Sequence, residues 1–521
     1  MLLKIRHALL EVSKSSTTST KQSGIIINNE VIICSGCILS SYVRPSDEEE
    51  SSVSATRYII DSLQQCKLIN AQEKNCEAAK YLRTLNYLVT FDRKLSERSA
   101  QQKTGNAVGP ILTRYTAQPL YVFCAVEVSR NLHKLLQTSA LNDEQNEVLR
   151  SSFLVLSMRP GDGSGGDDFN IKRFLQYIGN YLRYLQDFAI RTLDDVLVMC
   201  SPFGLENFYK TISIGKVSNV IGRSGCLFAL SNPLPLGCEG SAVFNNKLRL
   251  IGVIVCTSFQ RQQENVNLTI AANFGYLLRD FMEQLGVPIT TFHLQREPSN
   301  FAWERTIVVI ESSGQQGTGT FIKVHNKRFI LTCAHVVGQL NTKVHCRAAD
   351  RQFTADVLWC NPEVNRPYDL ALLTAPINVP ERHFVRLARN RATMGQTVYN
   401  AGFPYYVNFN FKYDFNPSIF QGRIIKYDQG AIMSDGSVQA GQSGGPMFDQ
   451  NGCILGVCVS NIKYDDIVYP NINTAIPIWD VRATLYEFAR TSDVKVLNNL
   501  VANQDVQRVW SLELPPIRSK L

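Results

Sequence analysis

Short apolar segments, separated by turns that contain glycine or asparagine, fill the second half of the chain. Residues 330–337 and 369–373 are the clearest, each an apolar run next to a polar residue. Runs of this length between turn residues are typical of buried strands. Residues 312–319 predict a turn before a strand at 321–324, and residues 410–421 predict a loop that leads into another strand. This alternation of strands and turns predicts a pair of β-barrels.

Helical spacing of apolar residues is clearest in the first half. Apolar side chains recur every three or four positions over 171–188, behind Asn170, a residue type suited to an N-cap. Residues 71–90 have a weaker helical pattern. Helices are also expected at 274–282 and 479–488, each after a strand-rich stretch. We expect these last two to close two similar units.

The first half of the chain repeats features of the second. Residues 237–244 align with 441–448 without a gap, at an offset of 204 (441 − 237). Residues 250–255 fall on 454–459 at the same offset. A repeat of this size indicates duplication of a whole domain, so we expect two related units in tandem.

The domain plan follows from these patterns. Residues 1–289 form the first unit, which carries an insertion at about 45–120 with helical character. A polar, proline-containing linker covers 290–302, and the second unit covers 303–490. Residues 491–521 are expected to be a C-terminal tail.

Composition describes an ordinary globular protein. The chain has 521 residues, 45% hydrophobic and 19% charged, with a net charge of +8. The basic residues form no long block, so neither nucleic-acid binding nor membrane insertion is expected. No apolar run is long enough to span a bilayer, and the first residues do not resemble a secretory signal.

Cysteine usage indicates packed thiols rather than a metal site. The chain has 14 cysteines, many of them inside apolar segments. Cys34 and Cys37 have C-x-x-C spacing, but no second pair follows at the distance of zinc ligands. We therefore expect reduced, buried thiols, no metal and no cofactor.

The candidate chemistry lies in three motifs of the second half. Ser443 stands in the sequence GQSGGP, where glycines allow a sharp turn that points backbone N–H groups at one place. His335 ends one apolar strand, and Asp369 precedes another. A serine nucleophile needs a base and an acid that orients it, and the order His, Asp, Ser is that of chymotrypsin-like proteases.

These motifs resemble those of the trypsin-like domain of the Deg/HtrA serine proteases, over residues 303–490. The resemblance implies an all-β fold of two tandem double-barrel units, the first of them degenerate with helical insertions. It implies a catalytic triad of His335, Asp369 and Ser443, and an oxyanion hole made by the N–H groups of Gly441 and Ser443. Too few residues follow 490 for a PDZ domain, so regulation by such a module is not expected.

The specificity pocket of this fold is formed by residues just before the serine and by the strand after it. The resemblance places residues 437–440 and 457–461 there, with Ser437, Ala440, Val459 and Ser460 as the pocket residues. No acid stands where trypsin-like enzymes select Lys or Arg. A small or medium uncharged side chain, cysteine included, is therefore expected before the scissile bond.

The first unit lacks this chemistry. Glu239 stands at the nucleophile position, Ser152 at the acid position, and Gly36 or Cys37 at the histidine position. We interpret this unit as a pseudo-protease. Ser164 lies in a similar glycine-rich sequence, but that sequence lacks the other features of a serine loop, so a plain surface loop is expected.

The last three residues, Ser519, Lys520 and Leu521, form the S-K-L signal read by the peroxisomal import receptor. With this signal, the chain is similar to the peroxisomal members of the Deg/HtrA family. That implies a protease of the peroxisomal matrix that removes leader peptides from imported precursors, processes β-oxidation enzymes and cleaves after cysteine. Such enzymes self-associate and process themselves, so a homo-oligomer is expected and the Cys124–Ala125 bond is the first candidate for self-cleavage.

Two alternatives remain open at this stage. The chain could be a non-catalytic binding or chaperone-like scaffold that uses its first unit as an interaction surface. It could also be a general Deg-type quality-control protease. The sequence does not identify the proteins that are cleaved.

Overall fold

The computed structural model divides into two compact units. Unit 1 comprises Met1–Ile190 and Asp194–Glu297, and unit 2 comprises Arg191–Leu193 and Pro298–Leu521. The following ranges are described: 4–14, 19–43, 50–92, 112–136, 141–158, 170–185, 189–222, 225–261, 264–287, 289, 302–312, 315–338, 342–362, 367–404, 416–464 and 467–511. Among these residues, no helix is both long and apolar enough to cross a membrane.

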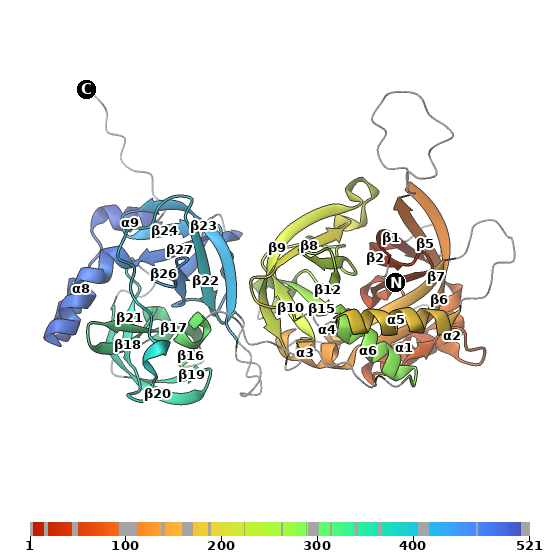
Figure 1. The fold of residues 1–521 in the computed structure, drawn as a ribbon, viewed down its shortest axis with the longest axis horizontal. Helices are drawn as coiled ribbons and strands as arrows, with labels where there is room; N and C mark the ends of the chain where they lie inside the picture. Colours follow the sequence, from red (N-terminus) through yellow and green to blue (C-terminus); the bar gives the residue numbers. More distant parts are fainter. Residues whose placement is uncertain are drawn as a thin grey trace, which may run out of the picture. The chain divides into compact units, whose positions relative to one another are not determined.

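The first barrel of unit 1 is a ring of antiparallel strands, closed by pairing between β6 and β7 (Figure 1). A short extra strand, β4, pairs with β6. The strands are β1 (Ile5–Ser13), β2 (Ser19–Ile27), β3 (Val31–Ser35), β4 (Ile69–Asn70), β5 (Asn86–Asp92), β6 (Leu112–Cys124) and β7 (Ser152–Met158).

The second barrel of unit 1 is closed in the order β10-β15-β12-β11-β8-β9, and a hairpin of β13 and β14 extends from it. Its strands are β8 (Asp195–Cys200), β9 (Thr211–Ile221), β10 (Leu227–Leu230), β11 (Ala242–Asn245), β12 (Leu250–Cys256), β13 (Phe259–Arg261), β14 (Glu264–Val266) and β15 (Thr269–Asn273). Each barrel of this unit encloses its own cluster of buried side chains.

Helices are the main addition to the barrels of unit 1, and they gather along one side of it in Figure 1. They are α1 (Glu50–Gln64), α2 (Glu77–Thr84), α3 (Val126–Leu136), α4 (Leu141–Arg150), α5 (Ile171–Leu185) and α6 (Phe274–Gln284). The expected cap of α5 is present, because the side chain of Asn170 accepts a hydrogen bond from the N–H of Arg173 at 3.0 Å.

The expected insertion at about 45–120 is only partly correct. Its first part forms α1, β4 and α2, but β5 and β6 belong to the barrel itself. A further helical addition, α3 and α4, lies between β6 and β7. The added helices therefore enter at two points of the barrel, which the sequence presented as one long stretch without a clear strand pattern.

Unit 2 contains two closed barrels, in the orders β16-β17-β18-β21-β20-β19 and β22-β23-β24-β27-β26-β25. The strands of the first are β16 (Ile307–Ser312), β17 (Gln315–Val324), β18 (Lys327–Thr332), β19 (Lys343–Ala348), β20 (Arg351–Cys360) and β21 (Ala371–Thr374). Those of the second are β22 (Thr397–Gly402), β23 (Ser418–Asp428), β24 (Ala431–Ser434), β25 (Pro446–Phe448), β26 (Ile454–Tyr464) and β27 (Ile467–Pro477).

The helices of unit 2 are few. A one-turn helix, α7 (Ala334–Val337), follows β18, and α8 (Ile478–Thr491) follows the last strand. Beyond it, a 3-10 segment at Val494–Asn499 and α9 (Gln504–Ser511) return to the barrels, where the indole of Trp510 donates to the carbonyl of Gly430. The described part of the expected tail, 491–511, is thus folded onto unit 2.

Two local expectations for unit 2 are wrong in detail. Residues 315–319 are already part of β17. Gly317 and Gly319 stand in this strand where side chains of neighbouring segments approach the backbone closely. Residues 418–421, the end of the expected loop, are in β23. Residues 410–415 of that loop, and most of the expected linker, 290–301, lie outside the described residues.

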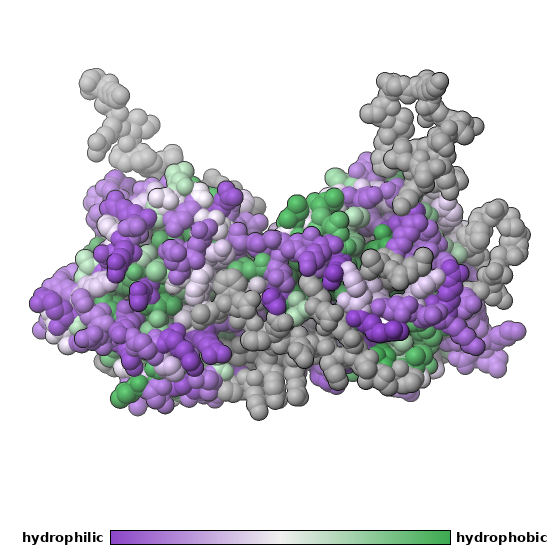
Figure 2. All heavy atoms as spheres, viewed as in Figure 1, coloured by the Kyte–Doolittle hydropathy of each residue, from purple (hydrophilic) through white to green (hydrophobic). Residues whose placement is uncertain are grey.

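The two units are duplicates at the level of strand register. The pairing of β11 with β12 shifts between Val243 and Phe244, and that of β25 with β26 shifts between Met447 and Phe448. A second shift separates Ile254 from Cys256 and, in unit 2, Cys458 from Ser460. Both pairs of irregularities keep the offset of 204, so the fold is two tandem units of the same double-barrel design. Polar side chains cover much of the visible face of each unit (Figure 2).

Candidate active site

The candidate histidine and acid lie next to each other in the first barrel of unit 2, close to the end of one strand and the start of another. β18 ends at Thr332, and His335 lies in the one-turn helix that follows. Asp369, fully buried, lies two residues before the start of β21. One oxygen of Asp369 accepts from the backbone N–H of His335 at 3.0 Å, and the other lies 2.5 Å from Nδ1 of the ring. This pairing fixes the ring by Nδ1 and leaves Nε2 for other partners.

The serine loop is held between the two barrels of unit 2. The carbonyl of Ser443 accepts from the N–H of Thr318 at 2.8 Å, and the hydroxyl of Thr318 donates to the carbonyl of Gly441 at 2.7 Å. Gly444 has a φ of 83°, and a Cβ there would lie 2.2 Å from the carbonyl oxygen of Thr318. Only glycine therefore fits at this position.

Gly317 shows how closely the two halves of the site approach. A Cβ at this position would lie 2.4 Å from a methyl group of Val336, the neighbour of His335, and 3.1 Å from the carbonyl oxygen of Ser443. The fold therefore brings the histidine segment and the serine segment close to the same glycine.

The hydroxyl of Ser443 donates to the carbonyl of Val459, at 2.9 Å. The loop before it is a tight turn, because the side chain of Gln442 accepts from the N–H of Gln439 at 2.7 Å and its N–H donates back to the Gln439 carbonyl. Among the described residues, the N–H groups of Gly441 and Ser443 donate to no other group. Two free donors beside a serine hydroxyl suit an oxyanion hole.

The expected pocket residues come from two segments near the serine. Ser437 and Ala440 precede the serine, whereas Val459 and Ser460 belong to β26. Asp435, the nearest acid in the sequence, is exposed. Its carboxylate accepts from the backbone N–H of Arg423, in β23, at 2.5 Å.

A network of uncharged polar groups surrounds Gly436, just before the expected pocket segment. The Asn473 amide donates to the carbonyls of Ser434 and Gly436, and the Asn400 amide donates to the Ser434 hydroxyl and the same Gly436 carbonyl. The sequence did not indicate this network, because its asparagines come from strands distant along the chain.

Comparisons with known proteins point to the same part of the chain. Residues 317–457 match the model of the trypsin-like peptidase domain. Unit 2 contains a trypsin-like peptidase domain.

Part of the chain is similar to two curated relatives. The peroxisomal leader peptide-processing protease of Homo sapiens is 28% identical over 362 residues, covering 61% of this chain and 60% of that protein. The Mus musculus protein of the same name is 26% identical over 360 residues, with coverage of 61% and 60%. The matched region thus spans less than two thirds of these relatives.

Solved structures are also similar over part of the chain. The Rv3671c protease in its inactive form is 25% identical with a TM-score of 0.29, covering 37% of this chain and 91% of that one. The active form, from M. tuberculosis, is 24% identical with a TM-score of 0.28, covering 35% and 80%.

One group of metal-ligand types occurs in the peptidase domain. Ligand atoms of Cys333, His335 and Asp369 all lie within 4.8 Å of one another. The Cys333 thiol donates to the Cys458 carbonyl, and burial, with the charge of Asp369 second, raises the pKa of Cys333 well above its usual value. A protonated thiol is a poor ligand, and Asp369 already pairs with His335, so this group does not fit a metal ion.

Unit 1 contains the counterpart of the peptidase site without its chemistry. Cys34 pairs with Leu154 as Thr332 pairs with Ala371. His335 lies three residues after Thr332, and Asp369 lies two residues before Ala371. The same spacing from Cys34 and Leu154 places Cys37 at the histidine position and Ser152 at the acid position. Burial, with Glu239 second, raises the pKa of Cys37 to about 12, so this thiol is neither a base nor a ready nucleophile.

Glu239, the counterpart of Ser443, is bonded within its own loop region of unit 1. One carboxylate oxygen accepts from the N–H of Gly237 at 3.0 Å, and the other accepts from the hydroxyl of Thr257 at 2.6 Å. Gly237 is the counterpart of Gly441 at the offset of 204. The group that would bind an oxyanion is therefore already bonded to the protein's own carboxylate.

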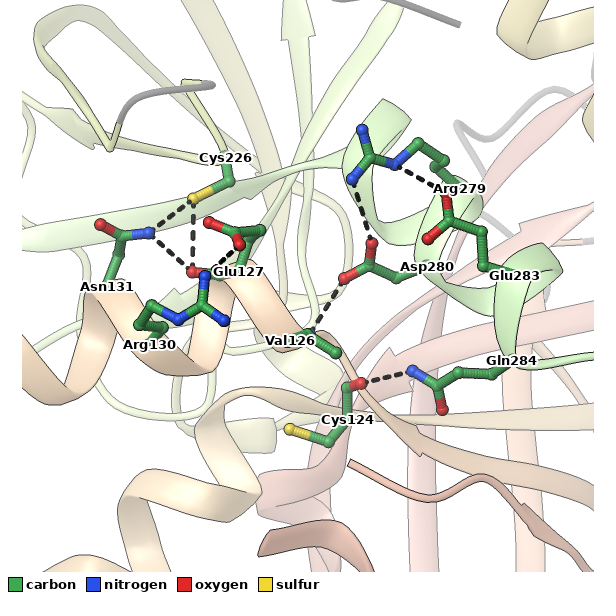
Figure 3. Close-up of polar contacts among 10 residues, drawn as sticks. All are labelled: Cys124, Val126, Glu127, Arg130, Asn131, Cys226, Arg279, Asp280, Glu283 and Gln284. Atoms are coloured by element: carbon green, nitrogen blue, oxygen red, sulfur yellow. Dashed lines mark hydrogen bonds and ion pairs between the residues drawn. The ribbon is translucent and has the colours of Figure 1, made fainter. Parts of the chain in front are cut away.

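The candidate self-cleavage bond is enclosed in unit 1 (Figure 3). Cys124 and Ala125 are buried where β6 leads into α3. The carbonyl of Cys124 accepts from the side chain of Gln284 at 2.8 Å, and Asp280 accepts from the N–H of Val126 at 2.9 Å. A protease needs this carbonyl in its own oxyanion hole, so cleavage at this bond requires opening of the β6–α3 junction. It stays a prediction.

Two other candidate positions lie outside the described residues. They are Ser164, in the glycine-rich loop of unit 1, and the terminal tripeptide of Ser519, Lys520 and Leu521.

All fourteen cysteines lie in described parts of the chain, and all are free thiols, as the sequence predicts. Ten of them are buried, including Cys34, whereas Cys37 is partly buried.

Proposed function

We propose that this protein is a serine endopeptidase of the peroxisomal matrix that removes leader peptides from imported proteins. The observation that carries the proposal is the bonded pair of His335 and Asp369, set beside a serine loop with two free N–H donors. The name of the curated relatives supports the substrate class, and the terminal S-K-L sequence supports the compartment.

In the proposed mechanism, His335 accepts the proton of Ser443 as the hydroxyl oxygen attacks the scissile carbonyl, and then gives it to the leaving amine. Asp369 holds the ring by Nδ1 and stabilises its charged form. The hydroxyl, bonded to Val459 in this structure, turns about its Cα–Cβ bond toward Nε2. The N–H groups of Gly441 and Ser443 stabilise the oxyanion, and water releases the acyl group by the same route in reverse.

Replacement of the nucleophile tests the catalytic part. Ser443→Ala is expected to lower kcat by roughly 10⁴–10⁶-fold while leaving the thermal unfolding curve unchanged. Peptide cleavage and covalent labelling by a fluorophosphonate probe are the measurements. Ser241→Ala is the matched control, because this serine lies in the corresponding loop of unit 1 and its hydroxyl has no partner among the described residues. Undiminished cleavage by pure Ser443→Ala protein would refute the assignment.

Compartment and substrates are tested in cells. Deletion of residues 519–521 is expected to move the protein from peroxisomes to the cytosol, because the import receptor reads a free C-terminal tripeptide. Imported precursors, β-oxidation enzymes among them, are expected to keep their leader peptides in cells that express only Ser443→Ala. Sequencing of mature N-termini measures both the cut position and the residue before it. Normal N-termini in those cells would contradict the role in leader removal.

A further inference from the structure

Two cysteines of unit 1 that are distant in the sequence lie against each other. Cys124 is the last residue of β6, and Cys66 lies three residues before β4. β4 pairs with β6 in antiparallel register, with Ile69 opposite Val122, so the chain before β4 runs beside the end of β6. The thiols of Cys66 and Cys124 are hydrogen-bonded to each other, and both are free. Neighbouring segments that place two thiols in contact have the close approach that a disulfide requires.

Cys66 occupies an unusual backbone position. Its φ is 54°, in the left-handed region that glycine or asparagine normally fills at the end of a helix. The N–H of Cys66 donates to the carbonyl of Leu63 at 2.9 Å, and that of Lys67 donates to the carbonyl of Ser62 at 2.8 Å, so the chain turns sharply after α1. A cysteine held in a conformation that suits glycine indicates that its side chain has a role.

The surroundings of Cys66 suit reaction with an oxidant, because this residue is partly exposed. The hydrogen bond from the Cys124 thiol lowers the pKa of Cys66 to about 7, and the charge of Arg130 acts in the same direction, whereas burial acts against it. The thiolate, which is the reactive form, is therefore well populated near neutral pH. Cys37 and Cys453 are also partly exposed, but burial raises the pKa of each.

Cys124 has the properties of the partner thiol in such a reaction. It is buried, and its pKa lies well above the usual value, first because of the hydrogen bond to Cys66 and second because of burial. Its sulfur lies 3.4 Å from the hydroxyl of Ser151, and its carbonyl accepts from the side chain of Gln284 (Figure 3). Cys124 is therefore shielded from a dissolved oxidant but is positioned to react with an oxidised Cys66.

We propose that Cys66 and Cys124 form a disulfide when the protein meets hydrogen peroxide, and that Cys66 is the thiol that reacts first. The bond ties the turn after α1 to the end of β6. The proposal is independent of the peptidase function, because it concerns unit 1 alone.

The reaction balances in two steps. The Cys66 thiolate attacks one oxygen of the peroxide, the O–O bond breaks, and the hydroxide that leaves takes up the proton that Cys66 had released. The Cys124 sulfur then attacks the sulfur of the sulfenic acid on Cys66, and the Cys124 proton leaves with the hydroxyl group as a second water. Two thiols are oxidised to one disulfide, and one peroxide is reduced to two waters. A dithiol reductant reverses the bond by exchange.

The test treats the full-length protein with hydrogen peroxide. The remaining thiols are then blocked with N-ethylmaleimide during unfolding, and the protein is digested without reductant for mass spectrometry. A pair of peptides joined through Cys66 and Cys124 is expected, with loss of the blocked form of both cysteines, and dithiothreitol is expected to restore both thiols. Cys66→Ser is expected to lose the joined pair.

Cys124→Ser separates the two steps, because Cys66 is then expected to remain a sulfenic acid that dimedone labels. Cys76→Ser is the matched control: this cysteine, just before α2, is also partly exposed, and its loss is expected to leave the joined pair intact. If Cys124→Ser fails to fold, as judged by thermal unfolding, Cys66→Ser and the reversal by dithiothreitol still test the pair. Recovery of both Cys66 and Cys124 in the blocked form after peroxide treatment, or a disulfide of either one with another cysteine, would overturn the inference.

Discussion

His7 is a buried histidine whose ring joins the two barrels of unit 1. Its Nε2 lies 2.7 Å from the hydroxyl of Ser201, and its ring lies 5.2 Å from that of Tyr209. Burial, with the charge of Lys210 second, lowers the pKa of His7 to about 3, while Asp92 acts in the opposite direction. The neutral ring is therefore part of the folded state.

The sign of the pH effect follows from that pKa. The unfolded chain binds a proton at His7 near pH 6.5, whereas the folded chain does so only near 3. Stability from this group is therefore complete above about pH 6.5 and falls as the pH drops toward 3. We expect the free energy of unfolding of unit 1 to decrease in this window by up to about 1.4 kcal/mol per pH unit.

Urea unfolding at a series of pH values measures this effect. His7→Gln is expected to flatten the decrease of the unfolding free energy at acid pH (the acid limb). His345→Gln, at an exposed position of unit 2, is expected to leave this decrease unchanged. An acid limb of the same slope in His7→Gln would show that other groups control the acid response.

The residues of the candidate site differ in how readily the sequence identifies them. Ser443, His335 and Asp369 stand in local motifs, since each catalytic position requires special neighbours, and the structure brings their segments together. Asn400 and Asn473 have no such motif, because their hydrogen bonds depend on which carbonyls lie opposite them in space. Sequence patterns report local constraints more readily than contacts between distant strands.

At the scale of elements, helix α6 controls the start of α3. Asp280 accepts from the N–H of Val126, the first residue of α3, and Gln284 one turn later holds the carbonyl of Cys124. Burial raises the pKa of Asp280 to about 6. The carboxylate thus replaces a side-chain cap that the sequence before α3 does not supply.

Asp280→Ala is expected to cost about 1–2 kcal/mol of unfolding free energy, because an N-terminal donor of α3 loses its acceptor. Hydrogen exchange measured by mass spectrometry is expected to quicken over residues 126–136. Glu283→Ala, in the same helix and pairing with Arg279, serves as the control. Unchanged exchange over α3 in Asp280→Ala would contradict this role.

Helices and strands could be predicted where the apolar residues followed a single regular spacing. The apolar residues at helical spacing after Asn170 correctly predicted a helix. The repeated segments 237–255 and 441–459 correctly predicted the duplication. The strands β5 and β6 were missed because they are embedded among helices that were added to the barrel. Glycines in β17 suggested a turn, since nothing in the sequence shows that neighbouring chains approach them closely.

At the scale of the whole molecule, each unit has cores of its own. Phe153 is fully buried in unit 1, 5.7 Å from the ring of Phe123, and Phe448 is fully buried in unit 2. Units with separate cores usually unfold separately. We therefore expect two transitions in calorimetry of the full-length protein.

Phe153→Ala and Phe448→Ala identify the transitions. Each removes a buried ring and is expected to cost about 3–5 kcal/mol within its own unit. Phe153→Ala should move only one transition, and labelling of Ser443 should persist up to the temperature of the other. A single transition that both variants shift would show that the units unfold together.

The carboxylate of Glu239, bonded to the N–H of Gly237, has a practical consequence for counting active molecules. In the proposed function, a probe that reacts with activated serines is expected to label Ser443 and not the corresponding loop of unit 1, because Glu239 stands at the nucleophile position there and occupies the N–H of Gly237. The amount of probe bound per mole of chain therefore equals the fraction of competent enzyme. In a preparation of this duplicated protein, the stoichiometry of a burst titration can be interpreted directly, without correction for the inactive half.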